Sequence, residues 1–151
     1  MKKRILTILF LLTCTAAQGQ SSVSEDAVKA AFIFHFIDFV EWSDEPSEFH
    51  ICIPDDANLR TAVSESLEGK LVKNKKILVV NQSDVCHILV SDNVPAADQT
   101  LTIGPLEKGA LLEFRVVNNK LRFAANLETI RKSKLKISSQ LLKLAILDKN
   151  S

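Results

Sequence analysis

Short apolar runs bounded by turn residues constrain the fold of this 151-residue chain more than any other feature. Continuous runs rich in β-branched residues, rather than alternating ones, are typical of parallel strands, which are covered on both faces. Segments with helical spacing of apolar residues precede and separate them. This alternation predicts a three-layer α/β sandwich with a mostly parallel sheet. The predicted strands are 49–53, 76–80, 86–90 and 101–103, and the helices are 24–42 and 58–67.

The pattern changes after Gly104-Pro105. Two apolar segments, 110–117 and 120–125, flank Asn118-Asn119, and a two-residue Asn connection tolerates the positive φ of a hairpin turn. The sheet is therefore expected to be mixed and to end in a C-terminal β-hairpin. A short helix over 126–132 and an apolar closing helix over 137–147 are expected to flank it.

The first 19 residues have the features of a secretory signal peptide. Three basic residues (Lys2, Lys3 and Arg4) precede an apolar run, and Ala17-x-Gly19 is a small-residue cleavage site. The apolar segment 5–17 has 13 residues, whereas a bilayer-spanning helix needs about 20. We expect residues 1–19 to be removed and residues 20–151 to form a single domain in the periplasm.

Charge and composition narrow the class of protein. Removing three of the 19 basic residues leaves 16 against 18 acidic residues, a net charge of −2. Such a balance does not favour a polyanionic partner, so no nucleic acid is expected. A hydrophobic content of 46%, with only four Gly and four Pro, indicates a packed core rather than disorder.

Two cysteines, Cys52 and Cys86, remain after cleavage. In an oxidising compartment an even pair most simply forms a disulfide. Cys52 is expected late in one strand and Cys86 at the start of another. Because a disulfide brings its Cα atoms within about 7 Å, the strands must be staggered or Cys86 must precede its strand.

A zinc site is the alternative, because His50-x-Cys52 and Cys86-His87 supply a ligand set that zinc accepts. Neighbouring residues of a strand point to opposite faces, so at most three of these side chains converge unless the backbone bends. The residues alone leave the disulfide and the zinc site open, and we predict the disulfide and no metal.

No catalytic motif is present. The chain has no G-x-S-x-G, no phosphate-binding glycine loop and no H-E-x-x-H, so we expect neither an enzyme nor a cofactor. Asp55-Asp56 follows a predicted strand and either begins the next helix or binds a ligand at the carboxyl edge of the sheet. Ser138-Ser139 beside Lys136 is interpreted as a helix cap.

Two aromatic residues, Phe34 and Trp42, fall on the polar side of the predicted helix 24–42, with Asp38 and Glu41. Exposed aromatic side chains are enriched at binding hot spots, so this face is predicted to bind a partner or a second copy of the chain. The alternative is that the closing helix covers both aromatics, since a helix that is apolar all round must itself be buried. His35, on the same side, is interpreted as a solvated surface residue.

Eight segments of the chain form an ordered set of motifs. They are VKAAFIFHFIDFVEW (28–42), FHICI (49–53), GK (69–70), CHIL (86–89), LTIG (101–104), LRF (121–123), NL (126–127) and LKISSQLLKLA (135–145). Taken in order, these motifs resemble the YfiR-like family of periplasmic regulatory proteins. The resemblance covers nearly all of residues 20–151, and its first and last motifs are the most specific.

This resemblance implies a regulator that represses an inner-membrane signalling enzyme, of the diguanylate cyclase type, by binding its periplasmic sensor portion. Family membership leaves open whether the partner is a cyclase, a histidine kinase or a receptor. In the best-known member of the family an outer-membrane lipoprotein relieves the repression, and cyclic di-GMP and biofilm formation respond to envelope or redox stress. It also implies a disulfide between Cys52 and Cys86, whereas the family's second disulfide has no counterpart because no cysteine follows Cys86. The alternative function is a periplasmic small-ligand sensor or carrier that uses the sheet edge near 54–56.

Overall fold

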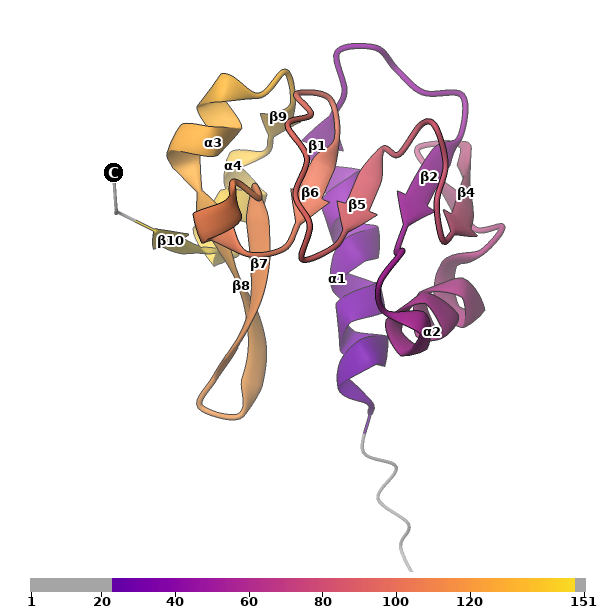
Figure 1. Cartoon of the computed structure of the whole chain (residues 1–151), viewed down its shortest axis with the longest axis horizontal. Coiled ribbons are helices and arrows are strands. Elements are labelled where there is room, and N and C mark those ends of the chain that lie inside the picture. The colour runs from indigo at the N-terminus through magenta and orange to yellow at the C-terminus, as the bar shows by residue number, and fades with distance from the viewer. Residues whose placement is uncertain (1–22, 149–151) are drawn as a thin grey trace, which may run out of the picture.

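The computed structural model describes residues 23–148, so the predicted signal peptide lies outside the described residues. Its elements alternate as expected and are labelled in Figure 1. The helices are α1 (Glu25–Phe39), α2 (Ala57–Leu67), the 3-10 helix η1 (Leu106–Lys108), α3 (Leu127–Lys132) and α4 (Ser139–Leu144). The strands are β1 (Val40–Glu41), β2 (Phe49–Cys52), β3 (Leu71–Val72), β4 (Lys75–Val80), β5 (Ile88–Val90), β6 (Leu101–Ile103), β7 (Leu112–Val117), β8 (Lys120–Asn126), β9 (Lys136–Ile137) and β10 (Ile146–Asp148).

Eight strands form one mixed sheet in the order β10-β8-β7-β6-β5-β2-β4-β3. The strands from β7 through β4 run parallel, while β8 is antiparallel to β7 and β3 is antiparallel to β4. β1 and β9 form a separate antiparallel pair. The predicted α/β sandwich with a mostly parallel mixed sheet, a C-terminal hairpin and flanking helices is confirmed.

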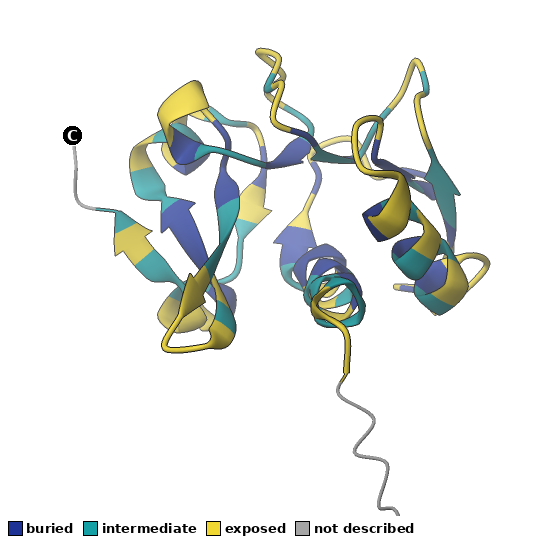
Figure 2. Ribbon diagram, turned by 60° about the horizontal axis from the view of Figure 1, so that its bottom comes forward, coloured by how far each residue is buried: buried dark blue, intermediate teal, exposed yellow. Residues whose placement is uncertain are grey.

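The first helix organises the core. Ser24 accepts a hydrogen bond from the amide of Ala27, and Glu25 and Asp26 occupy the first turn, where the helix dipole favours negative charge. Figures 1 and 2 show α1 between α2 and the β7–β8 hairpin. Its fully buried face packs aromatic rings against the hairpin, with the ring centroids of Phe36 and Phe123 4.9 Å apart.

Two tight turns use left-handed residues. Asn118 and Asn119 have φ of 51° and 59°, which confirms the predicted hairpin turn. A second hairpin, β3–β4, turns at Lys73 and Asn74 with φ of 52° and 62°. Residue type did not predict this turn, because Lys is uncommon in the left-handed region.

Two predicted helices were too long. The helix 24–42 ends at Phe39, because Val40 takes an extended conformation and pairs with Ile137 across β1–β9. The prediction of a closing helix over 137–147 is wrong. Only residues 139–144 are helical, and the side chain of Ser138 caps this helix. The chain then enters β10, which pairs parallel with β8, so its apolar residues belong to a strand.

Candidate functional site

The disulfide joins β2 to the segment just before β5. Cys52 and Cys86 are bonded with their Cα atoms 5.8 Å apart, which confirms the predicted pairing. The strand starts at Ile88, two residues later than expected, and Ile51 and Cys52 pair with Ile88 and Leu89. Cys86 therefore precedes its strand, and this placement resolves the conflict with parallel pairing.

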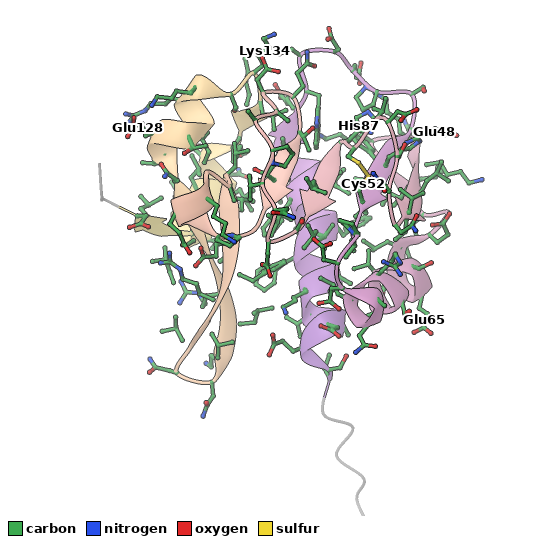
Figure 3. All side chains as sticks on the ribbon, viewed as in Figure 1. Glu48, Cys52, Glu65, His87, Glu128 and Lys134 are labelled. Atoms are coloured by element: carbon green, nitrogen blue, oxygen red, sulfur yellow. A yellow bond between two sulfur atoms is a disulfide. The ribbon has the colours of Figure 1, made fainter. Side chains whose placement is uncertain are left out.

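Two histidines lie beside this disulfide. Figure 3 labels His87 close to the disulfide at Cys52. The backbone N–H of His50 donates to Nδ1 of His87 at 3.0 Å, and the centroids of the two rings lie 5.5 Å apart. Burial lowers the pKa of His87, and repulsion from His50 lowers it further. A neutral His87 can accept this hydrogen bond on Nδ1, whereas the imidazolium cannot, because both of its nitrogens are donors.

The zinc alternative finds no support in the described residues. Both cysteines are held in the disulfide, and residues 23–148 contain no group of three or more His, Cys, Asp or Glu side chains placed to hold a metal ion. Instead, Nδ1 of His87 accepts a hydrogen bond from the backbone N–H of His50, and Nδ1 of His50 lies 3.3 Å from the carbonyl oxygen of Val85.

The carboxyl edge of the sheet brings together groups from three parallel strands. Asp56 caps α2 by accepting a hydrogen bond from the amide of Leu59, which is the helix-start role that the sequence suggested. Asp55 instead accepts a hydrogen bond from the hydroxyl of Ser91 at 2.6 Å, and this bond links the ends of β2 and β5. Gly104 follows β6, and a Cβ there would overlap the carbonyl oxygen of Ser91.

A cleft of about 480 Å³ opens at this edge. Its walls come from α1 through Lys29, from α2 through Leu59, from the ends of β5 and β6, and from β7 through Glu113 and Phe114. Burial raises the pKa of Glu113, but hydrogen bonds from Arg115 and from the amide of Leu106 outweigh it and hold that pKa below its usual value. Only Asp55-Asp56 indicated a site here from the sequence, because the other residues of the cleft come from distant segments.

The predicted partner surface is only partly at the surface. Asp38 and Glu41 are exposed, and so is His35. Phe34 is half-buried against the core. Trp42 is 8% exposed and packs against Phe49, with the ring centroids 5.1 Å apart and the ring planes tilted by 57°. The expectation of an exposed Trp42 is therefore wrong. Helix α1 ends at Phe39, three residues before Trp42. Helical spacing therefore does not determine the direction of the Trp42 side chain.

Ser138 and Lys136 have structural roles. Ser138 caps α4, as predicted, and its backbone N–H donates to the carbonyl of Phe39. Lys136 pairs with Glu41 in the β1–β9 register. The C-terminal segment therefore reaches the end of α1 through a strand pair, not through the predicted long helix.

Together these features define a disulfide-stabilised α/β domain with a mostly parallel sheet. Residues 26–146 match the YfiR/HmsC-like family, and the chain belongs to that family, as its motifs suggested. YfiR-like proteins are periplasmic regulators. Comparison with curated proteins finds no match. Within residues 23–148, no helix is both long enough and apolar enough to cross a membrane.

Proposed function

We propose that this protein is a periplasmic regulator, exported by a cleaved signal peptide, that represses an inner-membrane signalling enzyme of the diguanylate cyclase type. Membership of the YfiR/HmsC-like family is the observation that carries this proposal. The disulfide supports it, because such bonds persist in oxidising compartments such as the bacterial periplasm. The regulator acts by binding, not by catalysis, and an outer-membrane lipoprotein that competes for it relieves the repression.

The docking surface in this proposal is the exposed end of α1 and the strand that follows. Asp38 and Glu41 are exposed there, and within residues 23–148 neither carboxylate forms an ion pair. Unpaired carboxylates on a fixed helix end are suited to basic side chains of a partner, since complementary charge sets association rate and specificity. The half-buried Phe34 adds apolar contact area to this surface. Trp42 is buried in the core and is not part of the surface.

The test uses cells that carry the cyclase in the inner membrane. Deleting the gene for this chain should raise cyclic di-GMP and biofilm formation, and restoring it should lower both. The double variant Asp38→Lys/Glu41→Lys should behave like the deletion and lose capture of the cyclase from solubilised membranes. Both positions are exposed, so its thermal midpoint should fall only by the small cost of a second ammonium group opposite Lys136 across β1–β9.

The matched control is Glu65→Lys/Asp84→Lys, which reverses two other exposed carboxylates, on α2 and on the loop before β5. It should retain capture and repression. Loss of capture in both double variants would indicate a general charge effect and would reject this surface. Unchanged cyclic di-GMP in the deletion strain would reject the regulatory proposal itself.

A further inference from the structure

The cleft at the carboxyl edge lies where open α/β sheets bind ligands. From β2 the chain passes through α2 to β4 on one side, whereas β5 and β6 follow on the other side of β2. The direction of strand order therefore reverses at β2, and the crevice outside the carboxyl ends of strands at such a reversal is the usual ligand position. A volume of about 480 Å³ is within the range of small-molecule sites.

The walls combine an apolar surface with an excess of negative charge. Leu59, Val90, Ile103 and Phe114 supply apolar area. Five carboxylates line the cleft against the single ammonium group of Lys29; they are Asp55, Asp56, Asp92, Glu107 and Glu113. A cleft lined by one sign of charge concentrates counter-ions of the opposite sign.

Three of these carboxylates already have partners within the protein. Asp55 accepts from Ser91, Asp56 caps α2, and Glu113 pairs with Arg115. Among the described residues, the carboxylates of Asp92 and Glu107 form no hydrogen bond and no ion pair. Nζ of Lys108 lies beside this rim and donates to the backbone carbonyl of Asp92 at 3.2 Å, which leaves the two carboxylates available to a ligand.

An ammonium group of the protein already lies against the aromatic wall. Nζ of Lys29 is 5.9 Å from the centroid of the Phe114 ring, a cation–π distance. Its nearest carboxylates are Glu25, at 2.9 Å, and Asp26, at 4.0 Å, both on its own helix. The cleft thus accommodates an alkylammonium next to Phe114, and this observation is independent of the acidic rim.

We propose that the cleft binds a small organic cation, an ammonium group carried on an apolar or aromatic body. The body lies on Leu59, Ile103 and Phe114, and the ammonium group faces Asp92 and Glu107. The ammonium group of Lys29, over the Phe114 ring, is the competing positive charge in the cleft. This proposal does not depend on the cyclase or on the docking surface at the end of α1.

The test is calorimetric titration of the wild-type protein at low salt with three matched probes. Phenethylammonium carries the cation, 2-phenylethanol is its neutral isostere, and phenylacetate carries the opposite charge. Phenethylammonium should bind, with an affinity that falls as salt increases, and phenylacetate should not. Asp92→Asn/Glu107→Gln should weaken phenethylammonium binding about tenfold, because both facing charges are removed.

Two further variants make the result specific. Glu65→Gln/Asp84→Asn removes two carboxylates outside the cleft lining and should leave binding unchanged. Lys29→Gln removes the competing ammonium group and should tighten phenethylammonium binding, an effect that mere loosening of the fold would not produce. Equal binding of the three probes, no binding of phenethylammonium, or binding unaffected by Asp92→Asn/Glu107→Gln would each overturn the proposal.

Discussion

The Cys52–Cys86 disulfide is expected to be a large single contribution to the stability of this domain. The bonded cysteines are 34 residues apart in sequence, and the chain-entropy relation for a loop of that length gives about 4 kcal/mol at 25 °C. For a domain of this size each kcal/mol corresponds to roughly 3–5 °C in thermal midpoint, interpolated between smaller and larger proteins. Reduction should therefore lower the midpoint by about 12–20 °C.

The assay compares thermal unfolding of the mature protein with and without reductant, with Cys52→Ala/Cys86→Ala as a second route to the open state. The double variant should unfold near the reduced wild type and should not respond to reductant. A chelator should have no effect on either protein. Alkylation of both thiols in the native, unreduced protein, or a midpoint that falls with chelator and not with reductant, would refute the disulfide reasoning and restore the zinc interpretation.

The remaining predictions concern buried contacts. Trp42→Ala should lower the free energy of unfolding by about 3–5 kcal/mol in urea titrations, as expected for a buried aromatic residue; a change below about 1 kcal/mol would place Trp42 at the surface after all. Gly104→Ala should lower the free energy of unfolding by about 1–3 kcal/mol through overpacking, because the added Cβ meets the Ser91 carbonyl. Unchanged stability would show that the segments after β5 and β6 move apart at no cost. The pKa of His87 is lowered in the folded state by burial and then by His50, so the unfolded chain protonates first and the free energy of unfolding should fall as pH drops below about 6.5. His87→Asn keeps an acceptor at the δ position without titrating, and it should flatten this pH dependence in urea unfolding between about pH 5 and 7; an identical slope would exclude His87 as its source.

The parallel half of the sheet could be predicted because its strands have continuous apolar runs bounded by turn residues. The hairpin turn at Asn118-Asn119 could also be predicted, because Asn tolerates the positive φ found at both positions. The disulfide also followed from cysteine count and compartment. In each of these cases a local signal in the sequence agrees with the tertiary structure.

Segment 137–147 shows where such reasoning stops. Its apolar spacing suits a helix, but pairing of Ile146 with Ala124 of β8 makes the end a strand, and pairing of Ile137 with Val40 makes the start another. Both partners are distant in sequence, so local periodicity does not report them. The same pairing ends α1 at Phe39, which is why Trp42 enters the core instead of extending the predicted aromatic face.

One helix connects the two proposed sites but keeps them separate. Lys29 lines the cleft and Asp38 lies on the docking surface, nine residues further along α1. At 1.5 Å per residue their backbones are about 13 Å apart along the axis, and substitutions that far apart without shared partners usually act additively. Asp38→Lys/Glu41→Lys should therefore leave phenethylammonium binding intact, and Asp92→Asn/Glu107→Gln should leave partner capture intact. If either pair impaired both readouts, the two sites would have to be energetically coupled through α1, and neither could be regarded as a local surface.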